Sequence, residues 1–330
     1  MARDSTVLIT DHTWPDVDLE RTILEAAGLR VRDAPASDEA TLRSLAADAE
    51  AIMTCFAQVT PAIIASAPAL KVIARYGVGV DNIAIDVATA RRLPVTYVPD
   101  YCVAEVAEHA LALLLSLARG IVRYNRSVTA RGWDLGVGAP LRRIEGQMLG
   151  ILGCGRIGRR LAQSARGLGL RSVGYDADPS IAAVAASSGI ELVTLDEVLA
   201  RADFISVHLP LTPDTHAIIG ESILRRMKPT AFLINTARGG LVDISALSQA
   251  LRERWIAGAA LDVLPQEPPD SNNPLLDLDT VVLTPHVAFY SEESLQALRR
   301  RTAQSVVDVF AGREPEHVAN RAALAGLSPR

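Results

Sequence analysis

The feature that most constrains the fold is a glycine motif in the middle of the chain, the stretch GCGRIG that begins at Gly153. It directly follows the apolar stretch MLGIL and opens the helical stretch RRLAQSARGLG. In such a strand–turn–helix unit, Gly153 permits the tight turn, Gly155 lets the backbone approach a pyrophosphate, and Gly158 lets the helix pack closely on its strand. The N–H groups at the helix start, around Arg156 and Ile157, would then bind the anion. The motif therefore predicts a dinucleotide-binding unit.

An acidic residue follows at the end of the next expected strand, where SVGYD ends in Asp176. A carboxylate at this place accepts hydrogen bonds from a ribose 2′-hydroxyl and repels a 2′-phosphate. The pattern favours NAD over NADP as the cofactor. The alternative is a purely structural turn with a surface aspartate.

Short β-branched runs alternate with amphipathic helical stretches along most of the chain, which is typical of parallel sheets built from βαβ units. In the first hundred residues TVLIT, AIMTCF, KVIARYG and VTYVP read as strands, with helices around 18–28, 61–67 and 84–92. A second series of seven strands runs from QMLGILGCGRIG to TVVLTPH. The expected fold class is α/β, with two doubly wound parallel-sheet domains.

The last amphipathic stretch, SEESLQALRRRTAQSVVDVFAGREP, reads as a helix with Ser291 as N-cap and Ser294 near position N3. It has no strands of its own, so we expect it to return to the N-terminal domain. The prediction is a discontinuous, flavodoxin-like substrate domain of residues 1–100 plus 291–330. A Rossmann NAD-binding domain of residues 101–290 is inserted into it.

Between the two series lies CVAEVAEHALALLLSLARGIVRYNRSVTARG, which reads as one helix about 45 Å long. Its plain role is to connect the domains. Its additional apolar face indicates a subunit interface, so we expect a homodimer through the cofactor domain, with Trp133 capping the contact.

Composition excludes several other classes of protein. A net charge of −5 gives nucleic acid or an anionic membrane surface no attraction to the chain. Cys55, Cys102 and Cys154 lie far apart, which excludes a disulfide framework and a zinc cluster and suits a reducing cytoplasm. The N-terminus lacks the apolar stretch of a signal peptide, and the run HALALLLSLARGIV is too short to span a bilayer.

Three stretches after the cofactor motif carry side chains suited to catalysis. Arg238 in NTARGGLVD follows a strand and could bind a carboxylate, or simply pair with Asp243. Glu267 in ALDVLPQEPP reads by default as a solvated loop charge, and His286 in TPHVAFYSEES as a tolerated core or surface histidine. The other histidines have no metal-site spacing and read as structural or surface residues: His12, His109, His208, His216 and His317.

Several stretches together resemble one family. They are ARYGVGVDNI, VAEVAEHALALLL, GQMLGILGCGRIGRRLA, HLPLTPDTHAIIG, NTARGGLVD, AGAALDVLPQEPP and LTPHVAFYSEES. Over nearly its whole length the chain resembles the D-isomer-specific 2-hydroxyacid dehydrogenases, and most closely their C-terminal-binding-protein-like and phosphoglycerate-dehydrogenase-like branches. The resemblance implies that Arg238, Glu267 and His286 are catalytic. It also implies that Asp262 holds the nicotinamide amide and that Asp176 holds the adenosine ribose. Further cofactor contacts fall on Pro210, Thr215 and Thr236, and substrate contacts on Arg75, Val78, Gly79 and Phe289.

The implied reaction interconverts a small 2-keto acid and a D-2-hydroxy acid. Histidine ordinarily exchanges a proton near neutral pH, so His286 would act as the acid and base, with Glu267 orienting its ring. Arg238 would bind the keto acid and stabilise charge on its oxygen, and NAD would carry the hydride. The alternative on the same fold is an NAD(H)-sensing, corepressor-like binding protein.

Two departures from the family patterns concern the substrate. Phosphoglycerate dehydrogenases usually have an arginine in the loop where this chain has Thr54, so a phosphorylated substrate is less favoured, although Arg75 or a partner's arginine could substitute. The corepressor branch typically has a tryptophan where this chain has Phe289. The phenylalanine leaves a similar but smaller apolar surface.

Overall fold

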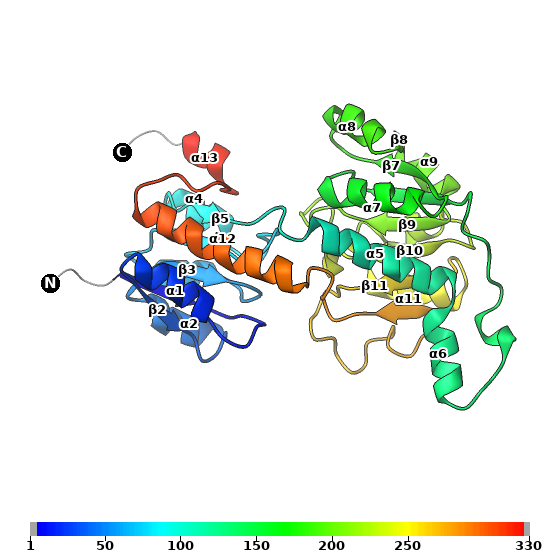
Figure 1. Cartoon of the computed structure of the whole chain (residues 1–330), viewed down its shortest axis with the longest axis horizontal. Helices are drawn as coiled ribbons and strands as arrows, with labels where there is room; N and C mark the ends of the chain where they lie inside the picture. Colours follow the sequence, from blue (N-terminus) through cyan, green and yellow to red (C-terminus); the bar gives the residue numbers. More distant parts are fainter. Residues whose placement is uncertain (1–4, 327–330) are drawn as a thin grey trace. The chain divides into compact units, whose positions relative to one another are not determined.

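The computed structural model describes residues 5–326 of the chain, which divides into two compact units (Figure 1). The first unit is Met1–Tyr101 with Ser291–Arg330, and the second is Cys102–Tyr290. The division falls one residue after the expected boundary, because Tyr101 belongs with the first unit.

The first unit contains a five-stranded parallel sheet in the order β2-β1-β3-β4-β5. Its strands are β1 (Ser5–Ile9), β2 (Leu29–Asp33), β3 (Ala49–Thr54), β4 (Val72–Arg75) and β5 (Val95–Thr96). This is the strand order of flavodoxin-like folds, as expected. The sequence patterns do not predict β2, because its run LRVRD places charged residues beside the apolar ones.

Helices cover both faces of this sheet: α1 (Asp18–Ala26), α2 (Glu39–Ala46), α3 (Pro61–Ser66), α4 (Ile85–Ala90), α12 (Glu292–Phe310) and α13 (Arg321–Ala325). Successive side chains of a strand point to opposite faces, so β1 contributes to two cores. Val7 and Ile9 pack in one core with Leu298 of α12. Leu8 packs in the other core with Leu42 of α2, a helix that the sequence patterns do not predict.

Helix α12 joins the first unit although it comes last in the sequence, and it lies beside α1 in Figure 1. Its start confirms the expected cap: Ser291 Oγ accepts a hydrogen bond from the Ser294 N–H, and Ser294 Oγ accepts one from the Ser291 N–H, each at 2.9 Å. Arg299 of α12 donates to the fully buried Glu20 of α1 at 2.7 Å. This capped and paired helix closes the discontinuous unit.

The second unit contains a seven-stranded parallel sheet in the order β12-β11-β10-β9-β6-β7-β8. The strands are β6 (Met148–Leu152), β7 (Arg171–Tyr175), β8 (Ile190–Leu192), β9 (Phe204–Val207), β10 (Phe232–Asn235), β11 (Gly258–Leu261) and β12 (Val281–Leu283). Counted from β6, this is the 3-2-1-4-5-6 order of a Rossmann fold with one further strand. The seven expected strands and the α/β fold class are confirmed.

Helices also cover both faces of the second sheet: α5 (Val103–Ala118), α6 (Ile121–Thr129), α7 (Arg156–Arg166), α8 (Ala182–Ser187), α9 (Leu195–Arg201), α10 (Glu221–Leu224) and α11 (Ile244–Arg252). Short 3-10 turns are η1 (Leu135–Gly138), η2 (Pro179–Ile181) and η3 (Gly239–Leu241). Leu113 of α5 and Leu161 of α7 share a core with Ile151, and these two helices lie side by side in Figure 1. Leu152 packs in the opposite core with Leu247 of α11.

The expectation of one helix about 45 Å long was wrong. The segment forms two helices, α5 and α6, separated at Gly120. Gly120 has a φ of 60°, the left-handed conformation that ends a helix and that glycine adopts without a steric penalty. Helix α5 is therefore about 24 Å long, and α6 buries none of its residues within the described chain.

Residues 1–4 and 327–330 of the expected first domain lie outside the described residues. Within the described part of the chain, no helix is both long enough and apolar enough to cross a membrane. The same residues bring together no cluster of three or more His, Cys, Asp or Glu side chains that could hold a metal ion.

Candidate active site

The glycine motif forms the turn between β6 and α7. Gly153 has a φ of 94°, and a Cβ atom there would lie 2.7 Å from the carbonyl oxygen of His208. A Cβ at Gly158 would lie 2.4 Å from the Gly153 oxygen, so this glycine lets α7 pack on its strand. Gly155 differs, because an added Cβ would have no heavy atom within 4 Å. Only Gly155 among the three faces open space.

Asp176 lies directly after β7 and beside the glycine motif. Its Oδ2 accepts a hydrogen bond from the Cys154 N–H at 2.8 Å, and its Oδ1 accepts one from the Asp178 N–H at 3.0 Å. The carboxylate that is expected to bind the ribose is therefore hydrogen-bonded to the glycine-rich turn.

Three further residues were expected to contact the cofactor. Thr236 follows β10, and its hydroxyl is buried without a hydrogen-bond partner among the described residues. Thr215 donates to the carbonyl oxygen of Pro210 at 2.7 Å, which closes the loop after β9. A buried hydroxyl without a partner is costly, so Thr236 is best explained by a ligand that completes it.

These features fit a bound dinucleotide. Helix α7 has Gly155 as its N-cap, and no side chain caps the N–H groups of its first turn. The open space at Gly155, the Asp176 carboxylate and the Thr236 hydroxyl lie at the ends of β6, β7 and β10. The carboxyl ends of the strands are where doubly wound sheets bind their ligands.

His286 and Glu267 form a close pair after β11 and β12. His286 Nδ1 lies 2.7 Å from Glu267 Oε2, and the Leu264 N–H donates to Glu267 Oε1 at 2.9 Å. The two side chains are 22% and 33% exposed, so both are shielded but remain accessible. Burial opposes ionisation of Glu267, but the His286 hydrogen bond and charge, the Leu264 N–H and the Arg238 charge together hold its pKa below the ordinary value.

Arg238 is brought near this pair by a close backbone contact. A Cβ at Gly239 would lie 1.9 Å from the carbonyl carbon of Leu264, so only glycine lets the loop after β10 pack against the loop that carries Glu267. Asn235 fixes the Arg238 backbone by donating to its carbonyl oxygen at 2.8 Å. The three residues expected to be catalytic therefore gather at one edge of the second unit's sheet.

Asp262 organises the turn that carries His286. Its Oδ1 accepts hydrogen bonds from the Thr284 hydroxyl at 2.6 Å and the Val287 N–H at 2.9 Å, and its Oδ2 accepts one from the Ala288 N–H at 2.9 Å. The His286 N–H donates to the Asp262 carbonyl oxygen at 2.7 Å. A carboxylate oxygen has two acceptor positions, so Oδ2 keeps capacity for the nicotinamide amide, and that assignment stays a prediction.

Phe289 stands edge-on to His286. The ring centroids of His286 and Phe289 are 6.3 Å apart at an interplanar angle of 78°. This geometry places an apolar ring beside the proposed proton donor.

The expected substrate-binding loop lies in the first unit, directly after β4. The Arg75 side chain is buried, and a Cβ at Gly77 would lie 1.9 Å from its Nη1, so the guanidinium packs beneath this turn. Val78 is 39% exposed and Gly79 is partly exposed. Arg75 therefore supports the turn that carries Val78 and Gly79.

Asp11 and Asn82 make contacts that the sequence patterns do not predict. In the first unit, the Asp11 carboxylate accepts hydrogen bonds from the N–H groups of Cys55, Phe56 and Ala57 at 2.9, 2.6 and 3.1 Å. The Asn82 amide donates to the carbonyl oxygens of Cys55 and Ala57 at 3.3 and 2.8 Å. The available signal was the position of Asp11 just past the carboxyl end of β1.

His109, expected to be a structural or surface residue, lies in α5 and contacts the turn before His286. Its Nε2 lies 2.9 Å from Thr284 Oγ1 and 3.5 Å from Asp262 Oδ1. No local pattern could have revealed this contact, because 175 residues separate His109 from Thr284.

Known proteins resemble both the sequence and the structure. Residues 111–288 match the family described as D-isomer specific 2-hydroxyacid dehydrogenase, NAD binding domain. The chain is 37% identical over 331 residues to a glyoxylate reductase of Thermofilum pendens, which covers 98% of this chain and 96% of the relative. It is 43% identical over 267 residues to a D-3-phosphoglycerate dehydrogenase of Methanocaldococcus jannaschii, over 80% of this chain and 50% of that relative.

A solved structure agrees with these sequence matches. It is the D-lactate dehydrogenase of Aquifex aeolicus complexed with NAD and lactic acid, with a TM-score of 0.84 and 27% identity over 99% of this chain and 100% of that one. The chain therefore belongs to the D-isomer-specific 2-hydroxyacid dehydrogenase family and is an NAD-dependent oxidoreductase of that class.

Proposed function

We propose that the enzyme reduces a small, unphosphorylated 2-keto acid to the D-2-hydroxy acid, with His286 as the proton donor and, in the reverse direction, the acceptor. The observation that carries this proposal is the 2.7 Å contact between His286 Nδ1 and Glu267 Oε2. A carboxylate can only accept a hydrogen bond, so Nδ1 must carry a proton to donate to Glu267. This leaves Nε2 to exchange a proton with the substrate.

The other residues divide the remaining tasks. Bound NADH supplies the hydride that attacks the carbonyl carbon. Arg238 binds the keto acid and stabilises the negative charge that develops on the carbonyl oxygen, before His286 protonates it. Glu267 orients the imidazole and stabilises its charged form.

The loop after β4 is the proposed site for the substrate carboxylate, through the backbone N–H groups of Val78 and Gly79. Two observations support an unphosphorylated substrate. Thr54 is buried and donates to the Ala57 carbonyl oxygen at 3.0 Å. Lys71, the next basic residue along the chain, pairs with Glu50 at 2.7 Å.

The test is NADH oxidation with a panel of keto acids: glyoxylate, hydroxypyruvate, pyruvate, phenylpyruvate and phosphohydroxypyruvate. Products with a chiral carbon are assayed for handedness. We expect turnover of unphosphorylated acids with a D product, and loss of most activity in Arg238→Gln. An L product, or a clear preference for the phosphorylated acid, would overturn the proposed substrate class.

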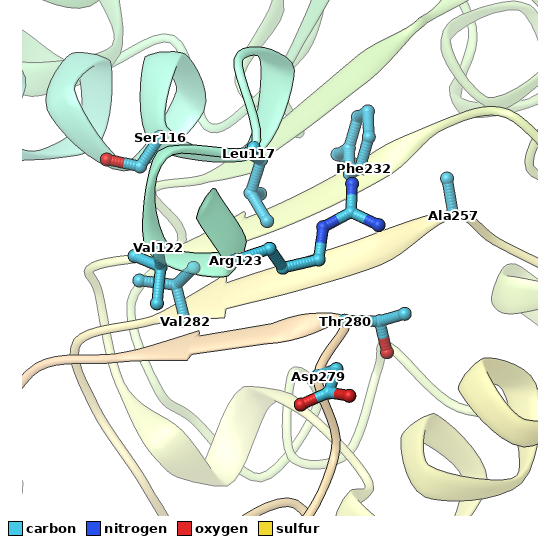
Figure 2. Close-up of a pocket in the computed structure, with 10 residues that line it drawn as sticks. Ser116, Leu117, Val122, Arg123, Phe232, Ala257, Asp279, Thr280 and Val282 are labelled. Atoms are coloured by element: carbon cyan, nitrogen blue, oxygen red, sulfur yellow. The ribbon is translucent and has the colours of Figure 1, made fainter. Parts of the chain in front are cut away.

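We also propose that the enzyme is a homodimer through its second unit. The segment from Ile121 to Val137, which follows the break at Gly120, leaves five large apolar side chains exposed: Ile121, Val128, Trp133, Leu135 and Val137. Trp133 is 91% exposed and Leu135 is 88% exposed. Beside α6, a pocket is lined in part by Leu117, Phe232 and Val282 (Figure 2). A second copy of the chain would remove this apolar surface from water.

Light scattering after size-exclusion chromatography tests the dimer. We expect twice the mass of one chain for the wild type and a folded monomer for the variant Trp133→Arg/Leu135→Asp. A wild-type monomer would contradict the proposal. A dimer that forms only with NADH would instead favour the NAD(H)-sensing, corepressor-like alternative.

A cytoplasmic location is the last part of the proposal. All three cysteines are buried, which suits a reducing compartment. Fractionation of cells that make the protein, with a cytoplasmic marker enzyme as control, tests this location. Recovery outside the cytoplasmic fraction would contradict it.

A further inference from the structure

A chain of hydrogen bonds runs from α5 to the turn that carries His286. The Thr284 hydroxyl has one proton and donates it to Asp262 Oδ1 at 2.6 Å, because a carboxylate can only accept. The contact of 2.9 Å between Thr284 Oγ1 and His109 Nε2 must then have the histidine as donor. The geometry therefore fixes the His109 tautomer that carries a proton on Nε2.

His109 also faces a buried charge. The Asp262 side chain is 1% exposed, and His109 is the only basic side chain that the described residues place within salt-bridge distance of it, at 3.5 Å. A buried carboxylate needs hydrogen bonds or an opposite charge to offset its lost hydration. His109 thus supports the orientation of the Asp262 carboxylate, through Thr284 and through its own Nε2 nearby.

The turn that Asp262 holds is strained. His286 has a φ of 53°, a left-handed conformation that costs a non-glycine residue about 1–2 kcal/mol. It persists because the Asp262 carboxylate accepts hydrogen bonds from the Val287 and Ala288 N–H groups, and the Asp262 carbonyl oxygen accepts one from the His286 N–H. Any loosening of the Asp262 carboxylate would therefore release the backbone that aims the His286 ring.

We propose that His109 is a positioning residue for His286. By donating to Thr284 it fixes the Asp262 carboxylate, and Asp262 holds the strained turn in the conformation that proton transfer requires. The inference rests on the proposed acid–base role of His286. The competing role is that of a residue that only packs α5 against the sheet.

Matched substitutions at His109 and Thr284, the two hydrogen-bonded residues, separate these roles. His109→Leu and Thr284→Val remove the hydrogen bonds at similar volume, whereas His109→Gln keeps an N–H donor and Thr284→Ser keeps the hydroxyl. We expect kcat for the best keto acid to fall about tenfold in the first two variants, with the KM for NADH within about twofold of wild type. The Gln and Ser variants should retain most of the rate.

The double variant His109→Leu/Thr284→Val tests whether the two residues act through one path. Its kcat should be no lower than that of the worse single variant, because either substitution alone already removes the hydrogen bond between the two residues. Multiplication of the two effects, or an unchanged kcat in His109→Leu, would overturn the inference.

An NMR readout separates failure of this inference from failure of the proposed function. The ring signal of His286, assigned by its loss in His286→Asn, should move or broaden in His109→Leu and stay in place in His109→Gln. An unmoved signal in His109→Leu overturns the positioning role whatever the activities are. Wild-type turnover by His286→Asn would instead reject the proposed acid–base role.

Discussion

His286 Nδ1 and Glu267 Oε2 lie 2.7 Å apart, although 19 residues separate them in the sequence. Burial alone would raise the pKa of Glu267, but the hydrogen bonds it accepts and the nearby Arg238 hold that pKa below the ordinary value. A carboxyl group whose pKa is depressed in the folded state stabilises the fold at pH values above its ordinary pKa. This contribution is lost as the pH falls through the pKa of the folded state. Glu267 therefore stays charged at neutral pH.

Glu267→Gln should lower kcat about tenfold to a hundredfold, since the amide cannot stabilise a charged imidazole. It should also lower the free energy of unfolding by about 1 kcal/mol at neutral pH. That loss should persist from neutral pH downward while Glu267 stays charged, and it should shrink as the pH falls through the depressed pKa of Glu267 in the acid range. Urea titrations across this range measure it, with the exposed Glu314→Gln as control. A stability difference independent of pH would argue against a charged pair.

The same substitution to alanine should affect stability at Gly239 and NADH binding at Gly155. Gly239→Ala should cost about 2 kcal/mol or more of stability, because its Cβ would lie 1.9 Å from the backbone of Leu264. Gly155→Ala should leave the melting temperature nearly unchanged, since its Cβ meets no protein atom within 4 Å, but raise the Kd for NADH about tenfold. Thermal unfolding and NADH fluorescence titration measure the pair. Normal NADH binding by Gly155→Ala would count against the pyrophosphate position.

The link between α1 and α12 should dominate the stability of the first unit. Glu20 is fully buried and accepts hydrogen bonds from Arg299 Nε at 2.9 Å and Nη2 at 2.7 Å. Glu20→Ala should cost about 3 kcal/mol, because it leaves a shielded guanidinium with a missing partner. Asp16→Ala, at the exposed edge of the same cluster, should cost less than about 1 kcal/mol. Equal costs in the two variants would show that burial does not set the strength of this pair.

Phe289 should set the preference for the substrate side chain, because its ring stands 6.3 Å from that of His286. Phe289→Trp should raise kcat/KM for aryl or thioether keto acids relative to pyruvate by about tenfold. Phe289→Ala should reduce it, with glyoxylate, which has no side chain, affected least. The measurement is kcat/KM across the keto-acid panel. Unchanged ratios would place the side-chain pocket elsewhere.

Local patterns predicted the parts of the molecule that depend on neighbours in the sequence. Alternating strands and helices gave both parallel sheets, and the spacing of Ser291 and Ser294 gave the start of α12. The glycine motif specified a turn whose φ at Gly153 and close contact at Gly158 the structure shows. In each case the physical cause lies within a few residues.

Long-range contacts could not be predicted in this way. The apolar pattern across Gly120 reads as continuous helix, because composition does not reveal that this glycine adopts a left-handed conformation. The roles of Glu267 and His286 came from the family resemblance, since a loop glutamate and a lone histidine are unremarkable on their own. Asp11 and His109 were missed because their partners are distant in the sequence, 175 residues away for His109.

The central claim is that His286 transfers the proton, and His286→Asn tests it most directly. Asparagine tolerates the left-handed conformation that His286 adopts, with its φ of 53°, so the turn should survive the substitution. The measurement is kcat for NADH oxidation with the best keto acid, after titration shows that NADH still binds. We predict a fall in kcat of about a hundredfold or more at unchanged NADH affinity. Turnover within a few-fold of wild type would contradict the assignment of His286 as the acid–base residue.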